Sequence, residues 1–279
     1  PHESSAEMRS APDLISPTEQ RLTEPSANSH QPALGSRLRR YALTAMILPV
    51  LLIHRLACGL DDWLFPSMHR VQINTPLFIV GVPRSGTSLV HLLIAGNRDS
   101  FTAMPLWELI VAPALCEKFA VSFAAAIDGC IGRPFSRLIV AVEHRLQKSI
   151  DALHPTTLRS PEEDYLGLLP FGDCFLMVLA WPDQRASWDL ACCPQRLSKQ
   201  RRLKLMRRYR GLLARHLHFR GLDRHVVSKN PSFTCWVTEL QDEFPDARFI
   251  GLRRDPAQSL PSQLSSITSG LRLFGHDVK

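Results

Sequence analysis

Three short apolar runs, each bounded by polar residues or prolines, stand out along the chain: residues 77–82 (LFIVGV), 225–228 (HVVS) and 248–252 (RFIGL). Uninterrupted apolar runs of this length are typical of strands that are buried on both faces of a parallel sheet. A segment with helical periodicity follows each run, at 86–95, at 232–244 and from about residue 256 onward. Strands that alternate with helices predict an α/β fold, in which helices flank a parallel sheet.

The long stretch between the first two runs is mostly helical in pattern. Residues 101–188 predict a largely helical insertion, with breaks at 129–132, 154–155 and 171–172. In the helix at 86–95, the spacing of Leu89, Leu92 and Leu93 predicts one buried face.

A basic helix is predicted at 196–220, which contains ten Arg and Lys residues and no acid. Its apolar positions recur at helical spacing, so the ordinary interpretation is an amphipathic helix with a solvated basic face. A patch for acidic lipid or nucleic acid is the alternative. The nucleic-acid version is disfavoured because no aromatic residues that could stack on bases are interleaved with the charges.

The amino-terminal part of the chain has a different character. Residues 1–40 are rich in proline and serine, and we expect a flexible tail. Residues 41–75 predict an apolar helix with a connector, and residues 76–279 predict the α/β domain. The apolar run 41–53 is only thirteen residues long, whereas a membrane span needs roughly twenty. A packing helix, a peripheral membrane helix and an anchor all remain open.

Composition narrows the functional classes. The chain has 279 residues, of which 33 are Lys or Arg and 26 are Asp or Glu, so its formal net charge is +7. A basic surface favours anionic partners such as nucleotides or acidic lipids. The seven cysteines are odd in number and form no Cys-x-x-Cys pair, which speaks against a disulfide scaffold or a zinc ribbon.

The loop after the first apolar run carries the clearest chemistry. Residues 81–88 (GVPRSGTS) join a predicted strand to a predicted helix with the G-x-x-x-x-G spacing of a P-loop, and such a loop surrounds an anion with backbone N–H groups. A nucleotide-hydrolysing P-loop has lysine after the second glycine. Here that position is Thr87, and the cation is Arg84 inside the loop. A guanidinium can bind an anion without a metal, so we expect the phosphate end of a nucleotide and no metal ion.

Two separated blocks resemble the sulfotransferases that use 3'-phosphoadenosine 5'-phosphosulfate (PAPS): residues 76–95 (PLFIVGVPRSGTSLVHLLIA) and 226–262 (VVSKNPSFTCWVTELQDEFPDARFIGLRRDPAQSLPS). The likeness is to the PRSGT-type, protein-tyrosine sulfotransferase-like branch, and it implies a P-loop-type fold. In that branch the chain usually continues further, so the domain is expected to be shortened at its carboxyl end. The resemblance assigns the 5'-phosphosulfate to Arg84, Ser85, Gly86, Thr87 and Ser88. It assigns the 3'-phosphate to Arg254 and Ser262, with Arg253 as a rival.

The resemblance also implies catalytic residues. Lys229 matches a lysine that neutralises the charge on the bridging oxygen, and Arg84 would help it to stabilise the sulfuryl group and the leaving phosphate. Glu108 matches a glutamate that accepts the proton of the acceptor group, with His91 and His154 as rivals. The run Ser160–Asp164 (SPEED) either starts a helix or supplies Glu162, Glu163 or Asp164 to the acceptor site.

The function that these residues predict is transfer of a sulfuryl group from PAPS to a hydroxyl or amine. A nucleotide kinase or other P-loop NTPase is one alternative, which Thr87 disfavours. A nucleotide-binding or membrane-surface protein without turnover is the other. The acceptor, the compartment (cytoplasmic or membrane-associated) and the oligomeric state stay open, and no specific nucleic-acid partner is expected.

Overall fold

The computed structural model describes residues 34–149, 157–221 and 223–276, and a four-stranded sheet lies at its centre. The strands are β1 (Leu77–Gly81), β2 (Phe101–Thr102), β3 (His225–Lys229) and β4 (Arg248–Leu252). They lie in the order β2-β3-β1-β4, and all neighbouring pairs are parallel. The predicted α/β fold with a parallel sheet flanked by helices is confirmed. The edge strand β2 has only two residues, which is too short for a hydrophobic pattern to predict.

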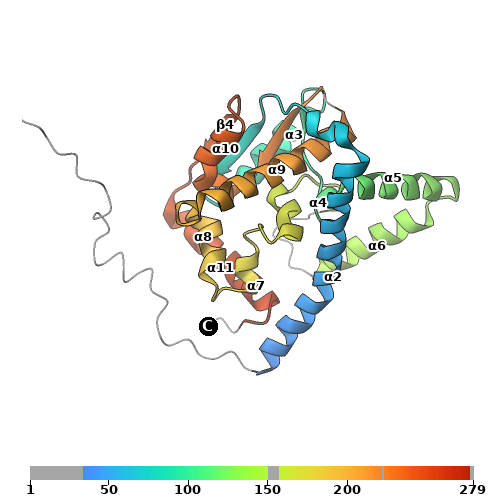
Figure 1. Cartoon of the computed structure of the whole chain (residues 1–279). Helices are drawn as coiled ribbons and strands as arrows, with labels where there is room; N and C mark the ends of the chain where they lie inside the picture. Colours follow the sequence, from blue (N-terminus) through green and yellow to red (C-terminus); the bar gives the residue numbers. More distant parts are fainter. Residues whose placement is uncertain (1–33, 150–156, 222, 277–279) are drawn as a thin grey trace, which may run out of the picture.

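One face of the sheet packs against α9 (Lys199–Arg220) and α10 (Val237–Glu243) and forms the main core (Figure 1). Phe78 of β1 lies near Tyr209 of α9 and Phe244, with ring centroids 6.3 and 5.6 Å apart. The predicted helix at 232–244 begins as a 3-10 helix, η4 (Pro231–Trp236), and continues as α10. Burial of these large rings, together with the aliphatic side chains around them, stabilises the domain.

On the other face lies α3 (Thr87–Ala95), and its orientation differs from the prediction. Leu89, Leu92 and Leu93 are 63%, 52% and 69% exposed, whereas Thr87 and His91 are buried. The expected buried leucine face is therefore wrong. The helix starts directly from the tight loop after β1, and this connection turns its polar side toward the sheet.

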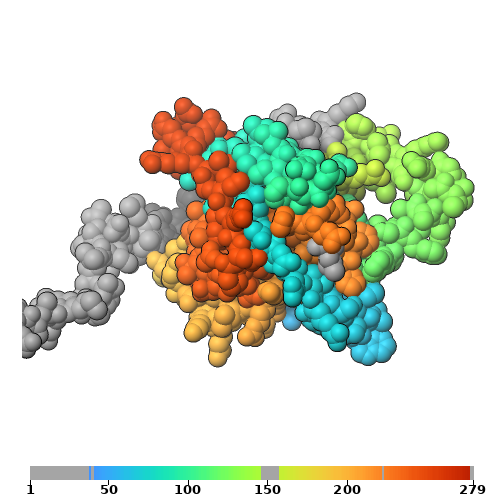
Figure 2. Space-filling view, turned by 90° about the horizontal axis from the view of Figure 1, so that it is seen from above, coloured from blue at the N-terminus to red at the C-terminus, as the bar shows by residue number. Residues whose placement is uncertain are grey.

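The predicted helical insertion is confirmed. It contains α4 (Leu106–Ile110), α5 (Leu115–Cys130), α6 (Pro134–Ser149), η2 (Asp164–Phe171), α7 (Met177–Ala180), α8 (Arg185–Cys192) and η3 (Pro194–Arg196). The expected breaks at 129–132 and 171–172 fall where α5 and η2 end, and the one at 154–155 lies outside the described residues. Helices α5 and α6 form a hairpin that projects from the body (Figures 1 and 2).

Two further helices frame the domain. Helix α2 (Leu34–Leu64) is followed by η1 (Pro66–Arg70), and α11 (Pro256–Leu273) follows β4. Most of the predicted tail, residues 1–33, lies outside the described residues, and residues 34–40 form the first turns of α2. Helix α11 starts with Pro256, as predicted, because the Asp255 carboxylate accepts a hydrogen bond from the N–H of Ala257 (2.9 Å).

Candidate functional site

The loop between β1 and α3 has backbone geometry that two of its glycines make possible. Gly81 has φ +137°, and a Cβ at this position would lie 2.2 Å from the carbonyl oxygen of Leu252 on β4. Gly86 has φ +93°, and no atom lies within 4 Å of the place where its Cβ would stand. Arg84 also has a positive φ, of 68°. Successive turns of this kind followed by a helix form a concave set of N–H groups that suits an anion.

Side chains of the loop offer further donors. The Ser85 hydroxyl is buried and has no hydrogen-bond partner among the described residues. A buried hydroxyl without a partner costs free energy, so a bound acceptor atom would be favourable here. Thr87 is buried at the first position of α3, and Ser88 is the next residue. These groups fit a phosphate or sulfate.

The second predicted anion clamp lies directly beside the loop. Arg84 Nε donates to Ser262 Oγ on α11 (2.8 Å), and Arg254 Nη1 donates to the carbonyl oxygen of Arg84 (2.9 Å). Arg253 is exposed and makes no hydrogen bond or ion pair to any described residue. The structure therefore brings Arg84, Arg254 and Ser262 together, and it favours Arg254 over its neighbour.

Lys229, at the carboxyl end of β3, joins the same cluster. The pairing of β1 with β3 places it opposite Ile79, so its side chain lies next to the loop. Its Nζ donates to Glu163 Oε1 (2.7 Å) and to Ser88 Oγ (3.3 Å), and the residue is buried. A cation, a loop hydroxyl and a carboxylate thus converge at one point.

The structure does not bring Glu108 to this cluster. Its carboxylate is completely buried, where Oε2 accepts from His216 Nδ1 (2.7 Å) and Oε1 accepts from Arg220 Nε (2.7 Å). Lys118 Nζ lies 3.8 Å from Oε2. Although burial tends to raise the pKa of Glu108, its hydrogen bond and attraction to His216 and the nearby cations hold the pKa below its usual value. A carboxylate that is enclosed and saturated in this way cannot reach an acceptor.

Glu163, and not Glu108, is the carboxylate that contacts Lys229. Its side chain is 24% exposed, so it can be reached from outside while it touches Lys229. The SPEED segment does not start a helix at Ser160, because η2 begins at Asp164 and the Ser160 hydroxyl bonds to Thr157 instead. The acidic run was the sequence signal for this residue, but the pattern could not separate a helix start from a site.

The next acid, Asp164, organises the segment that carries Lys229. It is buried and accepts hydrogen bonds from Tyr209 (3.0 Å), Ser228 (3.1 Å) and Asn230. Burial raises the pKa of Asp164 to about 6. Because Ser228 and Asn230 flank Lys229, these bonds fix the end of β3.

Two histidines, His91 and His154, were the alternatives to Glu108 as the base. His91 is buried on α3, and burial, with the nearby Lys229 charge, lowers its pKa to about 4. A ring enclosed in this way has no access to an acceptor. His154 lies outside the described residues.

Comparison of the sequence with known protein families gives a match. The profile of the sulfotransferase family matches residues 76–278. This chain belongs to the sulfotransferase family.

Several members of the family can be compared with this chain. It is 26% identical over 209 residues to omega-hydroxy-beta-dihydromenaquinone-9 sulfotransferase Stf3 of Mycobacterium bovis and of Mycobacterium tuberculosis, which covers 74% of this chain and 48% of theirs. The chain thus spans about half the length of the curated relatives it matches.

Two solved structures have the same fold. Sulfotransferase STF9 from Mycobacterium avium superposes with a TM-score of 0.65 at 16% identity, over 91% of this chain and 59% of that one. Sulfotransferase STF1 from Mycobacterium tuberculosis gives a TM-score of 0.57 at 20% identity, over 81% of this chain and 58% of that one.

A cavity of about 570 Å³ in this chain lies elsewhere. It is lined by α2, η1 and α9, including Arg55, Lys204 and Arg207. Residues of η1 precede β1, so this cavity lies toward the amino end of the sheet, whereas the loop is at the carboxyl end. Ligands of open α/β sheets bind at the carboxyl ends of the strands, and we therefore take the loop cluster as the candidate active site.

Proposed function

We propose that this sulfotransferase-family chain transfers the sulfuryl group of PAPS to a hydroxyl or amine of an acceptor. A bond forms between the acceptor oxygen or nitrogen and sulfur, and the bond between sulfur and the bridging oxygen breaks. Adenosine 3',5'-bisphosphate leaves with the bond's electron pair, and the acceptor proton passes to a carboxylate of the protein. The reaction needs no oxidant or reductant.

The loop and its neighbours would hold the donor. Residues Arg84 to Ser88 would surround the 5'-phosphosulfate, and Arg254 with Ser262 would bind the 3'-phosphate. In support of this, the Ser85 hydroxyl has no other partner in the described part of the chain. Arg254 and Ser262 each bond to Arg84, so the two anion sites would be adjacent. Paired guanidinium groups suit a donor with two anionic ends.

The observation that carries the proposal is the position of Lys229 between Ser88 and Glu163. The ammonium group would stabilise the negative charge that builds up on the bridging oxygen as the sulfuryl group leaves. Glu163 would accept the acceptor's proton, in place of Glu108. Lys229 and Glu163 lie beside the loop, where proximity to a bound donor would supply much of the rate.

The proposed acceptor is a hydroxyl on a lipophilic molecule. Two curated relatives are named as sulfotransferases of a hydroxylated dihydromenaquinone, which is a lipid. For this chain the assignment is an analogy, to which the partly exposed Glu163 adds a route by which an acceptor could arrive.

Calorimetric titration and a transfer assay together test the proposal. Adenosine 3',5'-bisphosphate should bind without magnesium, whereas ATP with magnesium should bind more weakly. With radiolabelled PAPS and a long-chain alcohol, Lys229→Met and Glu163→Gln should each lower kcat while the affinity for bisphosphate changes little. Preference for magnesium ATP would refute the donor assignment, and unimpaired transfer by Glu163→Gln would return the base to another residue.

A further inference from the structure

Two apolar surfaces lie outside the core on the same side of the molecule. One is the amino-terminal half of α2, residues 38–53, and the other is the α5–α6 hairpin, residues 119–142; we call them together the apolar arm. In Figure 1 the hairpin leaves the body on the side along which α2 runs, and Figure 2 shows the projecting hairpin from above. Large exposed side chains of the arm include Met46, Leu48, Leu52, Ile53, Phe123, Ile131, Phe135 and Leu138.

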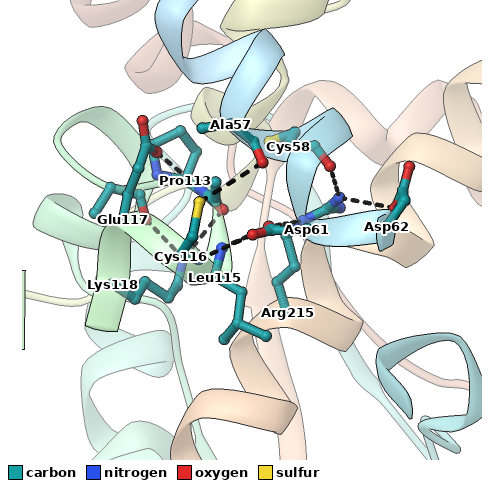
Figure 3. A network of polar contacts seen from close by, with 12 residues as sticks. Ala57, Cys58, Asp61, Asp62, Pro113, Leu115, Cys116, Glu117, Lys118 and Arg215 are labelled. Atoms are coloured by element: carbon teal, nitrogen blue, oxygen red, sulfur yellow. Dashed lines mark hydrogen bonds and ion pairs between the residues drawn. The ribbon is translucent and has the colours of Figure 1, made fainter. Parts of the chain in front are cut away.

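The carboxyl-terminal half of α2 is fixed to the domain (Figure 3). The Asp61 carboxylate is buried and accepts hydrogen bonds from the N–H groups of Leu115 (2.6 Å) and Cys116 (2.9 Å) at the start of α5. Arg215 of α9 donates to the same carboxylate (2.8 Å), and His54 pairs with Glu117 (2.7 Å). This half therefore cannot leave the protein without breaking a buried ion pair.

The anchoring limits what α2 can do in a membrane. Residues 41–64 are long and apolar enough to span one by length and composition alone. Of this apolar stretch, only residues 41–53 precede the anchored part, however, and thirteen helical residues extend over about 20 Å. The hydrocarbon core is about 30 Å thick, so this segment is long enough to enter one leaflet but not to cross both.

Charge around the apolar arm is mainly positive. Residues 34–53 and 119–145 contain six arginines: Arg37, Arg39, Arg40, Arg133, Arg137 and Arg145. These segments contain two acids, and both accept hydrogen bonds from backbone N–H groups. Asp128 accepts from Phe135 and Ser136 (both 2.9 Å), and Glu143 accepts from Leu158 (2.7 Å). Apolar residues bordered by arginines are the pattern of a helix that lies on an anionic lipid surface.

From these observations we infer that the apolar arm docks on an anionic lipid bilayer, with the hairpin tip and the free half of α2 in one leaflet. A second copy of the chain is the less suitable partner, because a symmetric contact would bring two arginine-bordered surfaces together. This inference goes beyond the proposed reaction and does not depend on it.

A fluorophore on a native cysteine tests the insertion directly. Cys130 is exposed at the hairpin tip, and Cys235 is exposed on η4, away from the arm. In chains whose other accessible cysteines are replaced by serine, each thiol is labelled with a polarity-sensitive dye. Vesicles that contain phosphatidylglycerol should shift the Cys130 emission to the blue, and brominated acyl chains should quench it. Neither change should occur at Cys235, and a probe at Cys130 that stays in water would overturn the inference.

Matched substitutions identify the residues that bind. Phe123 on the hairpin and Leu93 on α3 are 70% and 69% exposed. Phe123→Asp should lower co-sedimentation with the anionic vesicles about tenfold or more, since the new aspartate would carry a charge into the bilayer. Leu93→Asp lies outside the arm and should bind like the wild type. Unchanged thermal unfolding shows that both variants are folded. Equal losses in the two variants, or a dimer in light scattering that only Phe123→Asp dissociates, would refute the bilayer assignment.

Discussion

Replacing Glu108 with glutamine is expected to destabilise the protein rather than to remove a catalytic base. The substitution leaves Lys118, which is completely buried, without its carboxylate, although three carbonyl oxygens still accept from its Nζ at 2.8 to 3.3 Å. Removing one partner of a buried ion pair costs about 3–5 kcal/mol. The lower end applies, because glutamine keeps one acceptor oxygen and the partly exposed Arg220 can turn to water. We expect a loss of about 3 kcal/mol.

Urea unfolding followed by tryptophan fluorescence measures this loss as a lower midpoint with an unchanged slope. Glu163→Gln is the matched control. Its carboxylate is 24% exposed and makes one ion pair, to Lys229, which keeps its hydrogen bond to Ser88, so its removal should cost less than that of Glu108. Transfer activity per folded molecule should rank in the opposite order, with Glu163→Gln the more impaired.

The effect of pH provides a second check on the same residue. The pKa of Glu108 is lower in the folded protein than its usual value of 4.5, so its ionised form stabilises the fold above that pH. The difference between the wild type and Glu108→Gln should therefore be full above about pH 4.5 and shrink as the pH falls. A Glu108→Gln protein with wild-type stability and no transfer activity would refute this reasoning and restore Glu108 as the base.

Two further predictions concern the donor site and the helix beneath it. Arg254→Ala should weaken binding of adenosine 3',5'-bisphosphate by about 2 kcal/mol in calorimetry, as expected for a hydrogen bond to a charged group, whereas Arg253→Ala should bind normally; the reverse ranking would assign the clamp to Arg253. Burial lowers the pKa of His91 from 6.5 to about 4, so the unfolded chain binds more protons between these values. His91 should therefore cost the wild type about 3 kcal/mol of stability as the pH falls from 6.5 to 4, and His91→Leu should lack this component. Identical pH profiles of unfolding would contradict that view.

Much of the fold was predictable because its signals are local. Strands β1, β3 and β4 coincide with short apolar runs, and the glycines at 81 and 86 stand where the backbone needs a positive φ. The leucines of α3 show the limit of such signals. Helical spacing identified an apolar face, but the element that would cover it cannot be predicted from that spacing, and in the described structure the face is exposed.

The candidate site was predictable in part. Arg84, Lys229, Arg254 and Ser262 converge as the carboxyl ends of parallel strands bring their loops together. Glu108 does not join them, because α9, about a hundred residues later, supplies His216 and Arg220 that enclose its carboxylate. The pattern around an acidic residue contains no information about such distant partners.

The sequence by itself determined three of the four strands, the turn that surrounds an anion, and the membership of a family, since these depend on residues adjacent in the chain. The tertiary structure alone decided which glutamate faces Lys229 and which half of α2 is anchored. The physical reason is the same in both cases. The ionisation and exposure of a side chain depend on the groups that surround it, and here those groups come from segments far apart in the sequence.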